Sequence, residues 1–472
     1  TRYKLVTGVQ TCALPISLAR RLGLSEGDDR QRIDAILKRL RTEKLLLVLD
    51  DFEKNLNVGG GHYTDTMVGE WLEILCQACH RGRLLITSRH RPPDSESWLE
   101  TLALPPLSPA EARKLIIRLP QLSSRGNDDL RAILQRIGGH PRMLEYLDAV
   151  LRRGASRLPE IRHRLNRQAK AAGVALTSPP ATLDEAIARS LQLGAQDILL
   201  SELISLLTPT DRDILYQAAA SNLPIDSGGV ARALHDRTAD AKEQAGVLAS
   251  LTTLADLSLL SFVGEGTVFV HRWTAECLLS PRSGLDEVER RDIHARAGRY
   301  RLWRAANASH DVADGMEAVR NFLKADAFDE ATSLALDIVQ ALTHADQLAA
   351  AGGFAGELAE HTPPAHPNRA PLVDMEAESL IALGFTNRGL ACYRRLVADF
   401  EARCQAEPQR ADYQRDLSVS YNKLGDLMTA LGNGDDAQRY FLQALNIAEK
   451  LARAEPQRAD YQRDLSVSYN KL

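Results

Sequence analysis

The feature that most constrains the fold is a segment that occurs twice with identical sequence. AEPQRADYQRDLSVSYNKL occupies residues 406–424 and recurs at 454–472, which gives a period of 48. In and after the first copy, apolar residues follow one another at intervals of three or four, the spacing of one helical face. These residues are Tyr413, Leu417, Tyr421, Leu424, Met428 and Leu431. Helix hairpins repeated at such a period stack into a solenoid, whose concave surface binds protein or peptide.

A weaker copy of the same unit precedes the exact repeat. The turn sequence Gly432-Asn-Gly-Asp follows the first helix, and residues 437–451 carry the apolar face of a partner helix. Ala382-Leu-Gly384 lies 48 residues before Ala430-Leu-Gly432, at the equivalent end of an earlier helix. We therefore expect a helical repeat solenoid over residues 287–472.

The first part of the chain has the pattern of an α/β domain. Leu45–Leu49 form a short apolar run bounded by charged residues, which is typical of a strand buried in a parallel sheet. Helix-like residues 67–79 follow, and a second apolar run begins at Arg83. Because strand–helix–strand is the unit of parallel sheets, we expect an α/β domain over residues 18–106, with both runs as buried strands.

Helices and one small hairpin are expected between the sheet and the repeats. Residues 107–182 predict a small helical domain and a linker. In residues 183–282, three predicted helices are followed by two short β runs, 259–263 and 268–271. Gly264-Glu-Gly266 joins these runs, and three helices with a glycine-turned hairpin are the pattern of a winged helix.

The composition excludes several classes of protein. Lys and Arg number 58 against 62 Asp and Glu, so a strongly basic nucleic-acid binder is not indicated. Residues 242–257, the expected recognition helix of the winged helix, carry almost no basic residues, so nucleic acid is not an expected partner. No run approaches about 18 apolar residues, so no membrane span is expected. The 6 cysteines form no disulfide framework, and Cys76-x-x-Cys79 has no second pair for zinc, which favours free thiols in the cytoplasm.

Both ends of the sequence are expected to be incomplete. Residues 1–17 have neither an amphipathic period nor the design of a cleavable signal, and VTGVQTCALPI resembles translated sequencing-adapter read-through. The sequence also ends at Leu472, inside a repeat that has begun again. We therefore expect a chain truncated at both ends, with residues 1–17 as a non-native segment outside the predicted fold.

Candidate catalytic side chains follow the two predicted strands. Asp50 and Asp51 come directly after the first apolar run, and Arg89 ends the second, Leu84-Leu-Ile-Thr-Ser-Arg. Ligands of open α/β sheets bind at the carboxyl ends of the strands. One carboxylate there can hold Mg²⁺ through water, a second can orient or deprotonate an attacking water, and a guanidinium matches phosphate oxygens. Acids and arginines after strands are also common on surfaces, so each motif alone is weak.

Two further motifs lie in the helical part. Ile137-Gly-Gly-His-Pro-Arg is a sharp break before a helix, and Phe269-Val-His-Arg-Trp ends the predicted hairpin. A lone histidine on a strand is more often packed than a ligand. Taken in order, however, the four motifs resemble the nucleotide-binding switch ATPases of the NB-ARC/STAND class, over about residues 18–280. The helical repeats are similar to the tetratricopeptide (TPR) sensors of that class.

The resemblance implies a fold and a role for each site residue. Residues 18–106 would be the C-terminal part of a P-loop NTPase domain, followed by the small helical domain, the winged helix and the solenoid. Asp50 would hold Mg²⁺, Asp51 would position water, and Arg89 would sense the terminal phosphate of ATP.

The helical motifs would complete the nucleotide site. Gly139 would allow helices and nucleotide to approach closely, Pro141 would pack near the adenine, and His271 would reach the β-phosphate of ADP. His140 and Arg142 stand where the family has leucines, and Arg272 stands where it has an aspartate.

The sequence contains no Gly-x-x-x-x-Gly-Lys-Ser/Thr, the loop that supplies backbone N–H groups and a lysine to the phosphates. We therefore expect the 472-residue chain by itself to bind ATP poorly and to hydrolyse it negligibly. The resemblance further implies that the intact protein rests closed with ADP. A protein or peptide on the repeats would favour opening, exchange for ATP and self-assembly into a homo-oligomer.

Two alternatives remain open on the residues alone. The first is a non-enzymatic repeat scaffold, whose nucleotide domain has decayed and only packs structurally. The second is a transcriptional regulator of the same architecture, whose DNA-binding effector is lost from one end.

Overall fold

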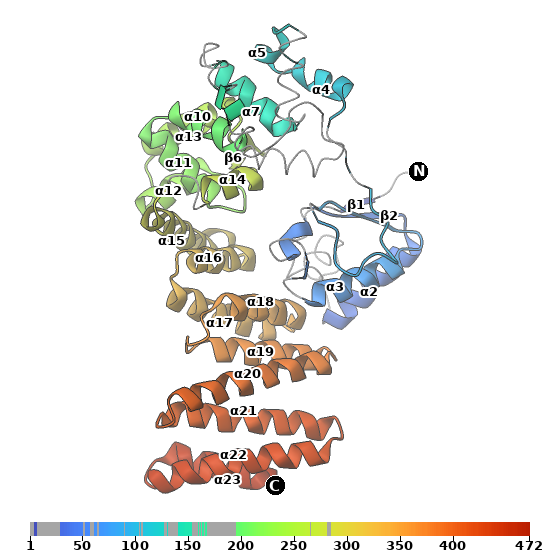
Figure 1. The fold of residues 1–472 in the computed structure, drawn as a ribbon, viewed down its shortest axis with the longest axis vertical. Coiled ribbons are helices and arrows are strands. Elements are labelled where there is room, and N and C mark those ends of the chain that lie inside the picture. Colours follow the sequence, from blue (N-terminus) through green and yellow to red (C-terminus); the bar gives the residue numbers. More distant parts are fainter. Residues whose placement is uncertain are drawn as a thin grey trace. The chain divides into compact units, whose positions relative to one another are not determined.

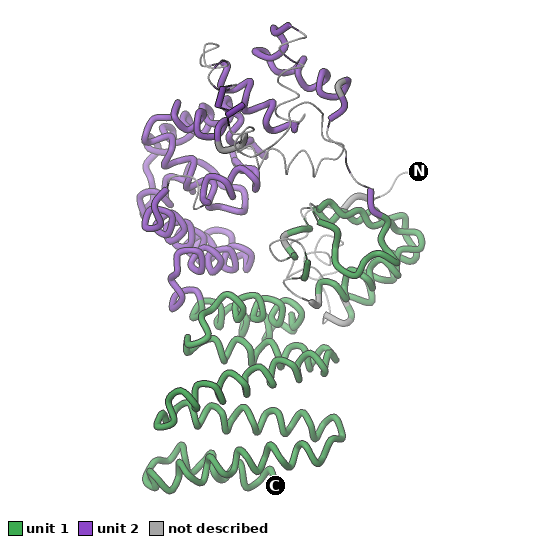
Figure 2. The backbone as a smooth tube through the Cα atoms, viewed as in Figure 1, with its two compact units in different colours: residues 1–100, 332–472 green, residues 101–331 purple. Residues whose placement is uncertain are grey.

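The structure is a computed structural model in which helices predominate among the described residues (Figure 1). The chain divides into two compact units, Thr1–Glu100 with Thr332–Leu472 and Thr101–Ala331 (Figure 2). The structure describes residues 4–6, 29–50, 52–56, 61–63, 66–88, 90–102, 104, 107–126, 130, 140–152, 159, 161, 163–164, 166–167, 195–264, 266–280 and 285–472. No helix within these ranges is long and apolar enough to cross a membrane.

The first unit contains a three-stranded parallel sheet in the order β1-β2-β3. Its strands are β1 (Lys4–Val6), β2 (Leu45–Leu49) and β3 (Arg83–Ile86). The two apolar runs therefore pair in parallel, as their spacing predicts. The prediction that residues 1–17 lie outside the fold is wrong for β1, which pairs with β2 through Lys4 and Leu45.

Helices α2 (Asp29–Thr42) and α3 (Thr66–Ala78) share a core with β2, built from residues such as Leu40, Leu47 and Leu72. A short 3-10 turn, η1 (Phe52–Asn55), follows β2. The expectation that the second strand is buried is wrong. Leu85 of β3 is 51% exposed, because β3 lies at the edge of the sheet formed by the described strands.

The second unit begins with helices and a small antiparallel sheet. The helices are α4 (Pro109–Ile116), α5 (Pro120–Ser123), α7 (Pro141–Arg152), α10 (Ala195–Ser205), α11 (Pro209–Ala219), α12 (Ser227–His235), α13 (Ala241–Asp256) and α14 (Arg272–Leu278). The sheet has the order β4-β6-β5, with β4 (Ile225–Asp226), β5 (Ser261–Phe262) and β6 (Thr267–Phe269).

From α11 to β6 the order is helix, strand, two helices and a hairpin, which is that of a winged helix. The hairpin strands lie within or next to the predicted runs but are shorter. Gly264 and Gly266 in the turn have φ of +79° and +72°, which glycine adopts without strain. β4 was not foreseen, because a strand of two residues leaves no pattern in the sequence.

A helical hairpin closes the second unit. It consists of α15 (Glu287–Arg304), a π-helical turn η3 (Ala305–Ser309) and α16 (Val312–Lys324). The helices approach closely at Gly298, where a Cβ atom would lie 2.7 Å from Cε1 of Phe322. The sequence predicts this hairpin as the start of the repeats, whereas the structure groups it in one unit with the winged helix.

The remaining helices form the repeat array. They are α17 (Phe328–His344), α18 (Leu348–His361), α19 (Arg369–Ala382), α20 (Thr386–Ala406), α21 (Ala411–Ala430), α22 (Gly434–Ala454) and α23 (Ala459–Lys471). Figure 1 shows the helices from α18 onward stacked side by side, each in contact with the next. Gly384 and Gly432, one repeat apart, follow α19 and α21 with φ of +90° and +75°. The predicted helical repeats and their turns are therefore present.

Candidate functional site

Asp50 lies at the carboxyl end of β2, where the parallel sheet offers a ligand site. Its carboxylate is exposed and accepts a hydrogen bond from the hydroxyl of Thr87, the first residue after β3. Two backbone hydrogen bonds fix this pair of strand ends. Thr87 N donates to Leu49 O at 2.9 Å, and Phe52 N donates to Thr87 O at 2.8 Å. The fold therefore holds a carboxylate and a hydroxyl together at one edge of the sheet.

These oxygens are of the kind that Mg²⁺ prefers. Among the described residues, no group of three or more His, Cys, Asp or Glu side chains forms a metal cluster. A single carboxylate fits Mg²⁺ only as the ion is usually bound beside a nucleotide, with waters and phosphate oxygens as its other ligands. Asp51 and Arg89, the other two predicted catalytic residues, lie outside the described residues.

Pro141 is the first residue of α7, a position that suits proline because the N–H it lacks has no partner there. The carbonyl of His140, just before it, accepts from Met143 N at 3.1 Å. Gly139 lies outside the described residues.

His271 caps the N-terminus of α14. Its Nδ1 accepts a hydrogen bond from Trp273 N at 3.3 Å, and its side chain remains exposed. Arg272, which replaces an aspartate of the resembled family, instead forms an ion pair of 2.8 Å with Glu276 on the same helix. The structure thus places His271 at an accessible turn between the hairpin and α14.

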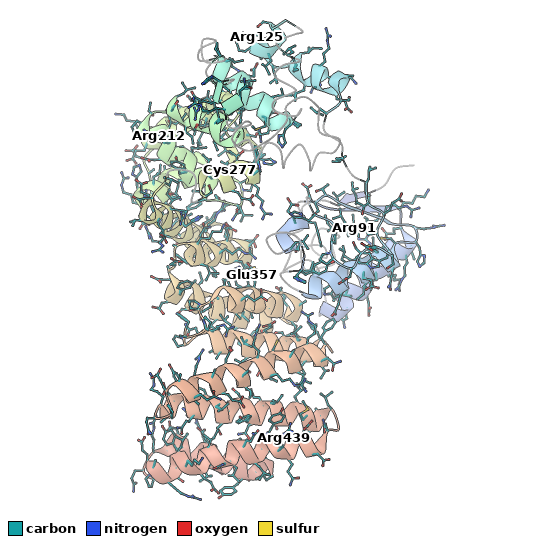
Figure 3. The ribbon with its side chains drawn as sticks, viewed as in Figure 1. Arg91, Arg125, Arg212, Cys277, Glu357 and Arg439 are labelled. Carbon is teal, nitrogen blue, oxygen red and sulfur yellow. The ribbon has the colours of Figure 1, made fainter. Side chains whose placement is uncertain are left out.

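The turn at Pro141 and the turn at His271 meet through aromatic side chains. The ring of His140 stacks on that of Trp273, with centroids 5.2 Å apart, and Tyr146 stacks against the same indole at 6.3 Å. The buried hydroxyls of Tyr146 and Thr274 are hydrogen-bonded at 2.6 Å. Helices α7 and α14 are therefore joined at their N-terminal turns; Cys277 marks α14 in Figure 3.

This environment changes the acid–base chemistry of His140. Burial, together with the neighbouring charges of Arg142 and His271, lowers its pKa to about 4. The ring is therefore neutral at neutral pH, and its buried Nδ1 makes no hydrogen bond within the described part of the chain. Thr87, His140 and Trp273 were not predicted as site residues. Only Thr87 left a usable signal, because it follows the second strand as Asp50 follows the first.

Comparison with known proteins gives distant similarities. No protein-family model matches the chain. It is 27% identical over 131 residues to an uncharacterized WD repeat-containing protein of Nostoc sp., a match that covers 26% of this chain and 10% of that protein. The chain thus spans about a tenth of the length of this curated relative.

The chain is also similar to the crystal structure of a Signal Transduction ATPase with Numerous Domains (STAND) protein with a tetratricopeptide repeat sensor from Pyrococcus horikoshii. The TM-score is 0.43 at 14% identity, and the match covers 99% of this chain and 74% of that one.

Proposed function

We propose that the chain is the switching and sensing part of an ATP/ADP-dependent signalling protein, in which the repeats control a nucleotide-binding module of the NB-ARC/STAND type. The observation that carries this proposal is the stack of His140 on Trp273. It brings together the turns of Pro141 and His271, two motifs far apart in the sequence that a single nucleotide would have to contact at once.

In the α/β domain, Asp50 holds Mg²⁺ at the end of β2, and the hydrogen bond from Thr87 orients its carboxylate. Asp51 positions the attacking water, and Arg89 contacts the terminal phosphate with its planar guanidinium. Mg²⁺, when bound, neutralises negative charge on the phosphates.

In the helical part, Gly139 allows the nucleotide to approach closely, Pro141 packs near the adenine, and His271 binds the β-phosphate. The exposed cap position leaves the His271 ring within reach of a ligand. His140 remains neutral and acts by packing, so it adds no charge to the phosphate site.

A protein or peptide bound to the repeats favours the open state, exchange of ADP for ATP and self-assembly. Moving such a switch from 1:99 to 99:1 requires about 5.5 kcal/mol of differential binding, which the γ-phosphate and the partner supply together. We propose the cytoplasm as its compartment, because the described cysteines form no disulfide with one another.

The competing function is a non-enzymatic scaffold that uses only the repeats. Equilibrium binding of ADP to the full chain, with and without Mg²⁺, separates the two. We expect weak binding that Mg²⁺ strengthens, and we expect Asp50→Asn to remove the Mg²⁺ effect. The control Glu96→Gln, at an exposed carboxylate of the same domain, retains it. If millimolar ADP does not bind either with or without Mg²⁺, the result favours the scaffold.

A further inference from the structure

The guanidinium of Arg272 has an N–H group that the protein does not use. Its Nε donates to Glu276 Oε1 at 2.8 Å, whereas its Nη1 is buried and has no hydrogen-bond partner among the residues that the structure describes. A buried donor without a partner is costly, and in a native structure it often marks a bound water or ion. Because the donor is positively charged, its strongest partner is an anion.

Lys324, in the last turn of α16, is a second cation near Arg272. It is exposed, and it forms no ion pair with the described residues. Partial desolvation lowers the pKa of its ammonium, and the charges of Arg320 and Arg272 act in the same direction, against those of Glu317 and Glu276. Three cations therefore face two carboxylates in this part of the second unit, which leaves an excess of positive charge.

The two cations come from different helices that the same packing holds in place. α11 packs against both α14 and α15, and α16 packs on α15. Gln217 of α11 donates from Nε2 to Ile293 O at 3.3 Å, and the buried His294 Nδ1 lies 2.9 Å from Asn321 Oδ1, one turn before Lys324. Buried polar contacts thus fix the helices that carry these cations, so an anion site between them is pre-organised.

We propose that Arg272 and Lys324 form a phosphate-binding site beside His271, in which Arg272 Nη1 and the Lys324 ammonium each donate to a phosphate oxygen. Guanidinium and ammonium groups both bind phosphate oxygens through charge-assisted hydrogen bonds. Arg272 stands where the resembled family has an aspartate, so this chain has a positive charge in place of a negative one next to His271.

This site rests on the proposed function, since the phosphate it takes is that of the nucleotide contacted by His271. It also adds a connection that His271 alone does not provide. Lys324 belongs to α16, the last helix before the repeat array begins at α17. A phosphate held by both side chains therefore links α14 of the winged helix to the hairpin that leads into the repeats.

The test is a titration of ADP, and separately of inorganic pyrophosphate, with the full chain, followed by phosphorus NMR of the ligand. We expect saturable binding of both ligands. Arg272→Gln and Lys324→Gln should each weaken both affinities at least about tenfold, because each variant removes one charged donor from the phosphate.

Two matched controls change the same charges elsewhere in the second unit. Arg299→Gln alters an exposed arginine that is paired with Asp236, and Lys242→Gln alters an exposed lysine of α13. Both controls should leave the affinities unchanged. Arg272→Gln breaks only a partly exposed ion pair with Glu276, so this variant should fold, which circular dichroism verifies.

The two ligands separate failure of this site from failure of the proposed function. If ADP binds the unaltered chain and both variants equally, the site is overturned and the nucleotide switch stands. If pyrophosphate binding depends on Arg272 and Lys324 but ADP does not bind, the site stands, its ligand is a free phosphate compound, and the nucleotide function is overturned. If neither ligand binds saturably, both are overturned.

Discussion

The imidazole of His140 stacks on the indole of Trp273, with ring centroids 5.2 Å apart and ring planes inclined by 26°. Aromatic pairs in such geometry contribute about 0.5–1.5 kcal/mol beyond the burial of their surface. His140 replaces a leucine of the resembled family, and Trp273 lies next to Arg272, which replaces an aspartate. The contact therefore joins two of the regions in which this sequence departs from the resembled pattern, and it holds the turn at Pro141 beside the turn at His271.

The buried ring of His140 should stay neutral across the physiological range. Its pKa is lowered to about 4 by burial and by the charges of Arg142 and His271. In a titration of histidine Cε1 resonances by NMR, the His140 signal should move by no more than about a tenth of its full titration shift between pH 8 and pH 5. The urea-unfolded chain is the control, since there all histidines titrate near about 6.5. A His140 midpoint near that value in the folded protein would show that the ring is not buried.

The same shift has a consequence for stability. Because the folded pKa of His140 lies below the unfolded value, the unfolded state binds more protons between about pH 6.5 and pH 4. The neutral ring therefore makes its full contribution to the free energy of unfolding of the second unit above about pH 6.5. This contribution is lost as the pH is lowered towards 4. His294 adds to this effect, since burial lowers its pKa to about 4 as well. Hydrogen exchange of α7 and α15 measures the change, and His140→Leu should make the decline shallower.

Arg301 holds α16 and the α11–β4 loop together at a buried site. Its guanidinium is 1% exposed and donates to Asp314 Oδ1 at 2.7 Å and to Leu223 O at 2.8 Å. Asp314→Ala leaves this charge buried without its counter-ion, which should cost about 3–5 kcal/mol of local stability, measured by hydrogen exchange of α15 and α16. Glu287→Ala breaks the exposed pair with Arg291 and should cost less than about 1 kcal/mol. Equal effects of the two variants would contradict this account.

Gly425 should be intolerant of even the smallest side chain. A Cβ at this position would lie 2.5 Å from Cε1 of Phe441, so Gly425→Ala should overpack the α21–α22 hairpin and destabilise it by about 1–3 kcal/mol. Phe441→Leu should partly rescue this variant, because it removes the ring that the new methyl group meets. Gly434→Ala is the control, since nothing lies near its Cβ position. Hydrogen exchange of the repeat helices, which reports their local stability, distinguishes Gly425→Ala, the double variant with Phe441→Leu, and Gly434→Ala.

The helical periodicity of the sequence was sufficient to predict the helices of the repeat array. Tyr421 and Leu424 are buried as predicted, whereas Leu431, the last residue of the predicted face, is 44% exposed because it lies at the end of the helix. Gly384 and Gly432 turn the chain at the predicted positions. The burial of β3 was mispredicted, because an apolar run does not show whether a strand lies at the edge of a sheet.

The candidate site was predicted only in outline. Asp50, Pro141 and His271 each lie at the end of an element, as their motifs indicate. Two contacts near these residues, one within each unit, are from Thr87 to Asp50 and from His140 to Trp273. Both depend on tertiary packing between segments distant in the sequence, which local pattern does not encode. Asp51, Arg89 and Gly139 remain predictions.

The central claim is that His271 recognises the β-phosphate of a bound nucleotide. The most direct measurement is a titration of the full chain, labelled at histidine Cε1, with millimolar ADP and separately with AMP in the presence of Mg²⁺. The account predicts that ADP shifts the His271 resonance in a saturable manner, whereas AMP, which has no β-phosphate, leaves it in place. If ADP leaves the His271 resonance unchanged, or if ADP and AMP shift it alike, the claim is contradicted.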